Sequence, residues 1–551
     1  MKKKNLIPLV ILALIFALGL GLRLYRLNLN SPPLYADETG QYVVLQNILH
    51  RHTNPIEFLI NISFSFTWLF GLTPLGVRFG SAIYGSLVVI LFYFLGLTIS
   101  KGRQAVGLTY SFLAAVLPWG IILSRLGLTH IGVIILFTSL HHYLYLRSRR
   151  ITDYLVCLLP LIIATVYYPT VLVALPFISF LVIRDILGLL KKRYHLPFLG
   201  VLLIIFIAFG TFVSVRSKIF SPSGRALDLA IWRDVNTPWE IDKYRSLSWT
   251  SSPSIFSFGL APESLANKLV YNRVMANIQT FLRNYLSFFS SDWLFLRGDP
   301  ILRHSTGQVG TFYPFLIPFM LIGIYIFFRT ADPKVRNIFL IWLITSPLPA
   351  ALTKDGFGYL LRVATLLPFL TYFCALGLVE AGKFFKGHWR IFYGLAVGSV
   401  GLFSVYYFFY GYFHVYPSLS ARSFEYGFKE LSDFQVAQAD APLLVIWDGY
   451  YHNNDFRFWQ NTPYPQYQDF KLVDKVMGES HFYQTFPNLY FVKPNSFKNL
   501  QLFIKANHPS FLVLPDRYFV NYPPELDKIY TSPSAIIKYP DQTPALKIFK
   551  L

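Results

Sequence analysis

Long apolar runs recur along most of the chain and limit what it can fold into. Each run approaches the roughly 20 residues that a helix needs to cross a bilayer. With 54% hydrophobic and only 14% charged residues, the chain has too few charges for a soluble protein. We therefore predict a polytopic α-helical membrane protein with about eleven transmembrane helices. The runs centre on residues 6–22, 75–99, 105–123, 131–146, 154–168, 170–183, 196–215, 312–328, 338–352, 363–379 and 391–413.

Lysine and arginine fall in alternate loops between these runs, at 101–103, 147–150, 191–193, 329–336 and 383–390. Cytoplasmic loops carry such an excess of cations. The pattern predicts a multi-pass protein of the cell membrane with a cytoplasmic N-terminus. The loop 28–74, the segment 216–310 and the C-terminal part then lie outside the cytoplasm. The formal net charge of +21 reflects this distribution and does not indicate a nucleic-acid partner.

The last part of the chain differs from the rest. Short β-like runs at 443–447, 511–514 and 545–549 are separated by polar, proline-rich and aromatic loops, and a helical pattern at 420–435 precedes them. This alternation predicts a small α/β domain on the extracytoplasmic side. We predict a transmembrane domain over residues 1–415 and this second domain over residues 416–551.

Two adjacent acids, Asp37 and Glu38, follow the first apolar run directly. Two prolines, Pro32 and Pro33, end any helix before them, and a helical pattern resumes behind them. A carboxylate at this place suits a catalytic base that works at the bilayer surface. An aspartate is also a favoured N-cap, so from these residues alone both interpretations stay open.

Isolated cations stand beside apolar runs on the side of the acid pair: Arg125, Arg303 with His304, and Arg362. Any one of them can simply extend to the lipid headgroups. Together they would form a site for one phosphate group, which arginine binds well because it is always charged and can donate two hydrogen bonds at once.

Several stretches carry a resemblance to a known family. These are LRLYRLNLNSPPLYADE at 22–38, VRFGSAIYGSL at 77–87, SRLGLTH at 124–130, LRGDPILRHSTGQVG at 296–310 and the segment 346–368. They resemble the GT-C glycosyltransferases, and more narrowly the bacterial and archaeal relatives of the dolichyl-phosphate-mannose protein mannosyltransferases (glycosyltransferase family 39-like). The resemblance covers most of residues 6–413. It implies an enzyme that moves a hexose from a polyprenyl-phosphate donor to an external lipid, glycan or protein acceptor.

The resemblance implies a role for each candidate residue. Asp37 would be the base, and Glu38 would hold the acceptor or orient the loop. The phosphate contacts would be Arg125, Arg303, His304 and Arg362, while Tyr42 and Gln46 would line the acceptor side. Because neighbouring residues on a helix do not point at one spot, the two acids cannot face each other across the sugar as in a retaining enzyme. One base and direct displacement predict inversion at the anomeric carbon.

The sequence departs from the family at three places. Thr129 and His130 stand where relatives often carry a further acid, and Tyr359 stands near the place of a histidine. The large external insertion of the eukaryotic enzymes is absent, which leaves lipid, glycan or cell-wall polymer as acceptors without support for protein. We expect no cofactor and no divalent metal. Two alternatives remain: a transferase using a lipid-pyrophosphate oligosaccharide, which usually needs a divalent cation, and a non-enzymatic transporter.

Overall fold

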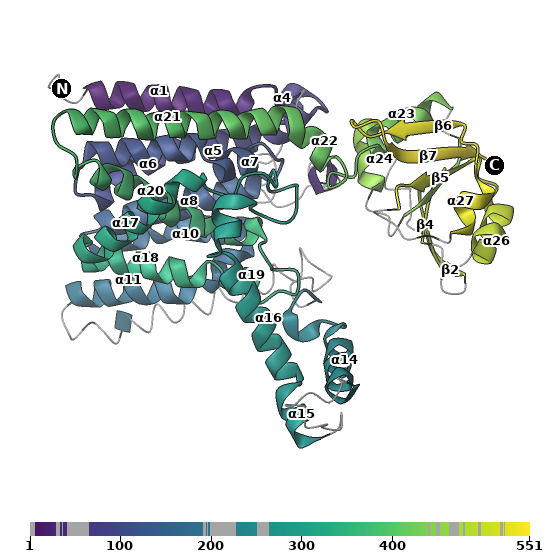
Figure 1. The fold of residues 1–551 in the computed structure, drawn as a ribbon, viewed down its shortest axis with the longest axis horizontal. Coiled ribbons are helices and arrows are strands. Elements are labelled where there is room, and N and C mark those ends of the chain that lie inside the picture. The colour runs from purple at the N-terminus through teal and green to yellow at the C-terminus, as the bar shows by residue number, and fades with distance from the viewer. Residues whose placement is uncertain are drawn as a thin grey trace. The chain divides into compact units, whose positions relative to one another are not determined.

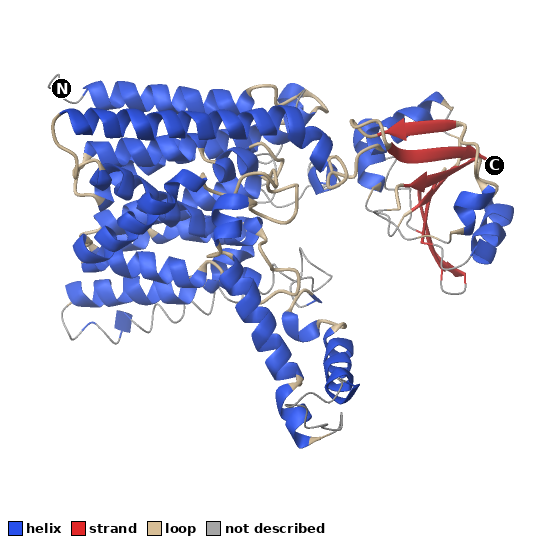
Figure 2. Ribbon diagram, in the orientation of Figure 1, coloured by secondary structure: helices blue, strands red, loops and turns tan. Residues whose placement is uncertain are grey.

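The computed structural model describes most of the chain, with gaps. The described residues are 6–28, 34–35, 37–40, 66–190, 194, 197–198, 228–250, 264–438, 441–447, 452–461, 473–477, 480–486, 488–493, 497–517, 522 and 524–551. They form a predominantly helical structure with one β-sheet (Figure 2).

Four helices of the described residues are long and apolar enough to cross a membrane: Leu6–Leu24, Pro74–Ile99, Leu360–Ala381 and His388–Ser420. A fifth span results if Gln104–Val116 and Pro118–Ser124, which meet at an angle of 52°, count as one. All of them coincide with runs predicted from the sequence. The multi-pass membrane class is therefore confirmed, while the count of about eleven helices stays a prediction. The predicted run 196–215 lies almost wholly outside the described residues.

The chain forms two compact units. Unit 1 comprises residues 1–17, 87–119 and 133–402, and unit 2 comprises residues 18–86, 120–132 and 403–551. Several helices run through the division between the units. The helices before the C-terminal part, labelled in Figure 1 where there is room, are α1 Leu6–Leu24, α4 Thr67–Phe70, α5 Pro74–Ile99, α6 Gln104–Val116, α7 Pro118–Ser124, α8 Thr129–Arg147, α9 Ile151–Val156, α10 Leu158–Tyr167, α11 Leu175–Leu189, α14 Thr237–Thr250, α15 Leu265–Val270, α16 Arg273–Ser287, α17 Ile317–Thr330, α18 Pro333–Thr345, α19 Leu348–Ala351, α20 Leu367–Ala381 and α21 His388–Tyr410.

Glycines allow helices α17 and α20 of unit 1 to approach each other closely. Gly323 of α17 and Gly377 of α20 each lie so near the backbone of the other helix that an added Cβ atom would overlap a carbonyl oxygen there. Small residues let helix backbones approach in this way inside a membrane, where the hydrophobic effect no longer drives helices together. A short 3₁₀ helix, η7 (Leu360–Leu366), leads into α20 and carries Arg362.

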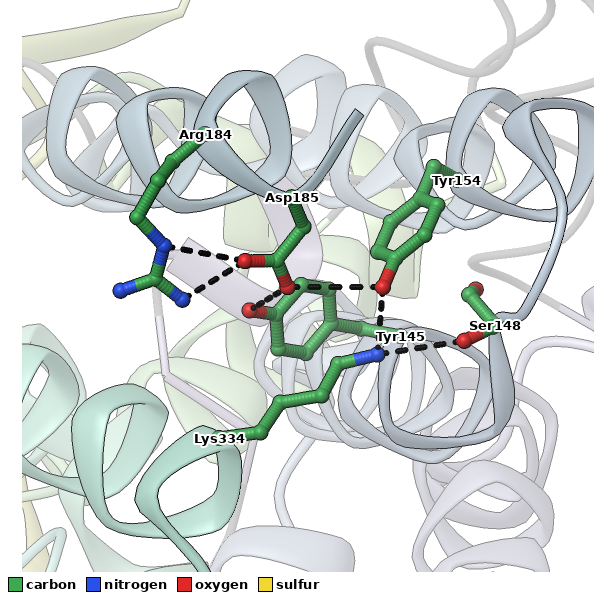
Figure 3. A network of polar contacts seen from close by, with 6 residues as sticks. All are labelled: Tyr145, Ser148, Tyr154, Arg184, Asp185 and Lys334. Atoms are coloured by element: carbon green, nitrogen blue, oxygen red, sulfur yellow. Dashed lines mark hydrogen bonds and ion pairs between the residues drawn. The ribbon is translucent and has the colours of Figure 1, made fainter. Parts of the chain in front are cut away.

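A polar network joins α8, α9, α11 and α18 in unit 1 (Figure 3). Asp185 Oδ2 accepts hydrogen bonds from the hydroxyls of Tyr145, at 2.9 Å, and Tyr154, at 3.4 Å. The ammonium of Lys334 donates to the Tyr154 hydroxyl at 2.9 Å and lies 4.5 and 4.6 Å from the two ring centres. Because burial disfavours its charged form, the pKa of Lys334 is lowered. The two aromatic rings and Asp185 offset this effect and connect four helices.

The C-terminal part of unit 2 contains a seven-stranded mixed sheet in the order β2-β3-β4-β1-β5-β7-β6. The central strand β1 runs parallel to β4 and β5, and the other pairs are antiparallel. All four residues of β1 are buried, as expected for a strand covered on both faces. The elements here are α22 Tyr416–Ser420, α23 Phe428–Ala437, β1 Leu443–Ile446, α24 Asn453–Trp459, β2 Val473–Met477, β3 Ser480–Phe486, β4 Leu489–Lys493, α26 Phe497–Asn507, β5 Phe511–Pro515, α27 Glu525–Ile529, β6 Ala535–Lys538 and β7 Pro544–Lys550.

The three predicted strands of this part correspond to β1, β5 and β7. Helices pack apolar residues against the sheet, including Leu431 of α23, Leu500 of α26 and Leu526 of α27, all fully buried. The presence of a small C-terminal α/β region is therefore confirmed. Its extracytoplasmic side and the boundary at residue 415 stay predictions.

Candidate active site

The acid pair lies in a short helical turn, residues 37–40 of unit 2. Glu38 and Arg78 are both fully buried, with 0% of each side chain exposed. The guanidinium of Arg78, near the start of α5, donates from Nε to Glu38 Oε1 and from Nη2 to Oε2, both at 2.7 Å. Two parallel charge-assisted hydrogen bonds of this kind fix both position and orientation.

Backbone donors complete the surroundings of the Glu38 carboxylate. The amide of Gly127 donates to Oε1 at 2.6 Å, and the amide of Tyr35 donates to Oε2 at 3.4 Å. A Cβ atom at position 127 would lie 2.9 Å from Oε1 and 2.8 Å from a methyl group of Val77, so glycine is required for this close approach. With four donors, the oxygens of Glu38 anchor the turn to two other segments of the chain.

Asp37 differs from Glu38 both in burial and in its polar contacts. Its side chain is exposed, and it forms no hydrogen bond or ion pair with another residue of the described ranges. The amides of Glu38 and Thr39 both donate to the carbonyl oxygen of Tyr35, so the Asp37 carboxylate does not cap them. The turn thus buries the carboxylate of Glu38 and leaves the carboxylate of Asp37 exposed. Tyr42 and Gln46, predicted on the acceptor side, lie outside the described residues.

Arg125 follows α7 in unit 2 and is buried, with 1% of its surface exposed. Its Nε donates to the Tyr412 hydroxyl at 3.1 Å, and its guanidinium lies 5.2 Å from the centre of that ring. Nη2 is buried and has no hydrogen-bond partner among the described residues. Nη1 donates to three carbonyl oxygens near the end of α1, those of Leu22, Arg23 and Tyr25. No carboxylate of the described residues forms an ion pair with Arg125, so its positive charge stays available to an anion.

The other predicted phosphate-binding residues lie in unit 1 and meet around Tyr359. The rings of His304 and Tyr359 are 5.2 Å apart edge to face, and the Arg362 guanidinium lies 4.5 Å from the Tyr359 ring centre. Burial raises the pKa of the Tyr359 hydroxyl to about 12, against the opposing charges of Arg362 and Arg303. Tyr359 therefore stays a neutral hydroxyl at physiological pH.

Two carboxylates hold members of this group. Buried Asp299 accepts from the amide of Leu360 at 2.8 Å, and its Oδ2 lies 2.9 Å from His304 Nδ1. Arg362 Nη1 lies 2.6 Å from Asp355 Oδ1, and Nη2 lies 3.0 Å from Oδ2. Burial alone would raise the pKa of Asp355, but the hydrogen bonds and the charge of Arg362 outweigh it, and the pKa is lowered. An incoming phosphate would have to replace Asp355 at this guanidinium.

The described residues contain no group of three or more histidine, cysteine or acidic side chains that could hold a metal ion. Asp292 forms an ion pair with Arg297 at 2.7 Å, and Asp299 and His304 pair with each other. Each of these side chains therefore already has a polar partner in its own loop.

The sequence analysis did not single out Arg78, the residue that pairs with Glu38 and not with Asp37. The sequence did contain a sign of this pair: a cation inside the apolar run 75–99 is costly unless it is paired, so it indicates a buried partner. Tyr359 was noted only as a departure from the family. Its contact with both His304 and Arg362 could not be predicted from spacing, because His304 is far from Tyr359 and Arg362 in the chain.

No protein-family model matches the sequence, and no curated protein matches it. Solved structures do match. Archaeal oligosaccharyltransferase AglB from Archaeoglobus fulgidus, in complex with an inhibitory peptide and a dolichol-phosphate, has a TM-score of 0.48 and 12% identity over 93% of this chain and 70% of its own. ArnT from Cupriavidus metallidurans, bound to undecaprenyl phosphate, has a TM-score of 0.45 and 13% identity over 99% of this chain and 97% of its own.

A second structure of the Archaeoglobus fulgidus oligosaccharyltransferase, in complex with Zn and sulfate, has a TM-score of 0.46 and 13% identity over 98% of this chain and 73% of its own. The matched proteins are an archaeal oligosaccharyltransferase, one structure of which contains a dolichol-phosphate, and ArnT bound to undecaprenyl phosphate. At these identities and TM-scores they add no argument about the reaction, which depends on the residues of this chain.

Proposed function

We propose that the protein is an inverting glycosyltransferase that moves a hexose, mannose or a similar sugar, from a polyprenyl-phosphate donor to an acceptor hydroxyl outside the cytoplasm. Asp37 is the proposed base. The observation that carries the proposal is the contrast within the acid pair: Glu38 is buried and paired with Arg78, whereas Asp37 is exposed and forms no hydrogen bond or ion pair with another described residue. The N-terminus is proposed to be cytoplasmic and the C-terminal α/β region extracytoplasmic.

The chemistry needs one free carboxylate. Asp37 accepts the proton of the acceptor hydroxyl while the oxygen of that hydroxyl forms a bond to the anomeric carbon. The bond between that carbon and the phosphate oxygen breaks, and its electron pair leaves with the polyprenyl phosphate. A retaining route would need a second carboxylate about 5 Å away across the sugar. Glu38 cannot serve, because all its hydrogen-bonding capacity is used by Arg78 and two backbone amides.

The departing phosphate needs positive charge as its own charge grows. Arg125 supports this role because, among the described residues, its buried Nη2 has no hydrogen-bond partner and no carboxylate forms an ion pair with it. Arg303, His304 and Arg362 are proposed as further phosphate contacts, with Tyr359 as a neutral hydroxyl among them. Glutamine variants of Arg125 and of Arg362 distinguish the two groups, because loss of a phosphate contact made in the transition state lowers kcat by about 10²- to 10³-fold.

The acceptor stays open between lipid, glycan and protein, with Tyr42 and Gln46 proposed to line its side of the site. No divalent metal and no other cofactor is proposed. If a chelator abolished transfer from the lipid monophosphate, the neutralising charge would have to come from a cation, and a lipid-pyrophosphate oligosaccharide donor would become the better candidate.

The test measures release of polyprenyl phosphate, which is a product with any acceptor. Membranes containing the full chain are given undecaprenyl-phosphate hexoses that carry a radiolabel in the polyprenyl chain, so that released polyprenyl phosphate can be counted. We expect Asp37→Asn to lower release by about 10²- to 10⁴-fold without a change in thermal stability. The matched control is Asp292→Asn, a partly exposed aspartate whose ion-pair partner among the described residues is nearby Arg297, and it should keep activity. Unchanged release by Asp37→Asn would remove this residue from the mechanism.

A further inference from the structure

Helix α24 of the C-terminal region contacts the turn that carries the acid pair, and both belong to unit 2. The hydroxyl of Thr39 donates to Asp455 Oδ1 at 2.8 Å, although 416 positions separate the two residues. A Cβ atom on Gly40 would lie 3.2 Å from the side-chain amide nitrogen, Nδ2, of Asn454. The helix therefore lies directly against the two residues that follow Glu38.

Apolar contacts accompany this hydrogen bond. Phe458 of α24 is fully buried and forms a small cluster with Leu34, which precedes the turn, and Val77 of α5. Partly buried Leu72 and Trp459 pack against the same cluster. Burial of such side chains makes the contact more than a single polar interaction.

Asp455 is itself held in place. Its Oδ2 lies 2.7 Å from His452 Nδ1, and His452 Nε2 lies 3.3 Å from Glu425 Oε2. The His452 ring stacks on Phe428 with 3.7 Å between ring centres. His452 and Asp455 are both buried, at 0% and 2% exposed. Each oxygen of Asp455 thus has a fixed partner, one in its own helix and one in the turn.

We propose that Asp455, oriented by His452, is a positioning residue for the catalytic turn, so that the C-terminal α/β region is a required part of the active site. This rests on the proposed role of Asp37. Glu38 fixes the turn from the side of α5, and Thr39 fixes it from the side of α24. Asp37 directly precedes these two anchored residues, so their contacts also fix its backbone. This matters because a catalytic base must be held within a fraction of an ångström of its productive position.

The first experiment needs no activity. Hydrogen–deuterium exchange of the intact protein in detergent reports on the amides of Glu38 and Thr39, which donate to Tyr35. We expect Asp455→Ala and Thr39→Val, which each remove one partner of the hydrogen bond, to speed exchange in this turn, whereas Thr39→Ser, which keeps the hydroxyl, should exchange at the wild-type rate. The control Asp516→Ala removes an ion pair with Arg422 in the same region and should leave the turn unchanged. Equal exchange in wild type, Asp455→Ala and Thr39→Val would overturn the proposal.

The second experiment is a double-mutant cycle on polyprenyl-phosphate release. Asp455→Ala and Thr39→Val should each lower kcat by roughly 10- to 100-fold, the range expected when a catalytic group is displaced by about 1 Å. KM for the donor should change less than about two-fold, because uniform binding is untouched. The double variant should lose no more than the worse single variant, since both changes break one hydrogen bond.

The outcomes separate the two proposals. Losses that multiply in the double variant, or a kcat loss that only follows a fall in melting temperature, would mean that Asp455 stabilises the fold without positioning the turn, and would overturn the inference. If wild type releases no polyprenyl phosphate, the proposed function fails, and the exchange measurement still decides whether α24 orders the turn.

Discussion

Because Glu38 is buried with Arg78 and Asp37 is exposed, neutralising these two neighbouring acids should have very different effects on the free energy of unfolding. Glu38→Gln removes the negative charge that forms the buried ion pair with the Arg78 guanidinium. The new amide also places N–H donors where Arg78 and the Gly127 amide donate at 2.6–2.7 Å. Breaking a buried pair in this way costs about 3–5 kcal/mol, a large share of the 5–15 kcal/mol that is typical of folded proteins. Asp37→Asn, at an exposed carboxylate, should cost less than about 0.5 kcal/mol.

The partner variant refines the prediction. In Arg78→Met the group left in the interior is the Glu38 carboxylate, which loses the guanidinium that forms its ion pair. We therefore expect Arg78→Met to destabilise the protein by about 3–5 kcal/mol as well, because removing either partner of a buried pair leaves the other charge uncompensated.

The assay is reversible unfolding of the detergent-solubilised protein in mixed micelles, which yields a free energy of unfolding. The matched control is Asp332→Asn, which breaks the surface pair of Asp332 and Lys101, 53% and 66% exposed. Exposed pairs contribute about 1 kcal/mol or less. If Glu38→Gln came within 1 kcal/mol of wild type by this measurement, the ion pair would not anchor the turn, and the distinction between the two acids would fail.

Three further outcomes are expected. Gly127→Ala should destabilise the protein and lower activity, because the methyl group would meet the Glu38 carboxylate; a melting temperature equal to wild type would contradict this. Lys334→Met should lower the melting temperature by removing the cation from the network of Figure 3, and Lys334→Arg should recover part of the loss. The lowered pKa of Asp355 means that its ion pair with Arg362 contributes stability above the ordinary carboxyl value of 3.8 and loses it as the pH falls through the folded-state value. The difference in melting temperature between wild type and Asp355→Asn should therefore shrink from neutral pH toward about pH 3.

Several features could be predicted from the sequence because they depend on local patterns. An apolar run of sufficient length has few alternatives to a membrane helix, and the described spans coincide with predicted runs. Short β-branched and aromatic runs between turn residues gave β1, β5 and β7 in the right places. The acid pair also stood out, since it follows a span directly. The count of about eleven spans and the roles of Tyr42 and Gln46 stay predictions.

Only the tertiary structure could show which acid is free. Asp37 and Glu38 are chemically similar neighbours, and nothing within the turn distinguishes them. Glu38 is engaged because Arg78, 40 positions away, meets it from α5. Asp455, 416 positions from Thr39, reaches the same turn from α24. Contacts over such separations depend on how helices pack, and packing depends on shape and burial along the whole chain, which a residue pattern in one segment does not contain.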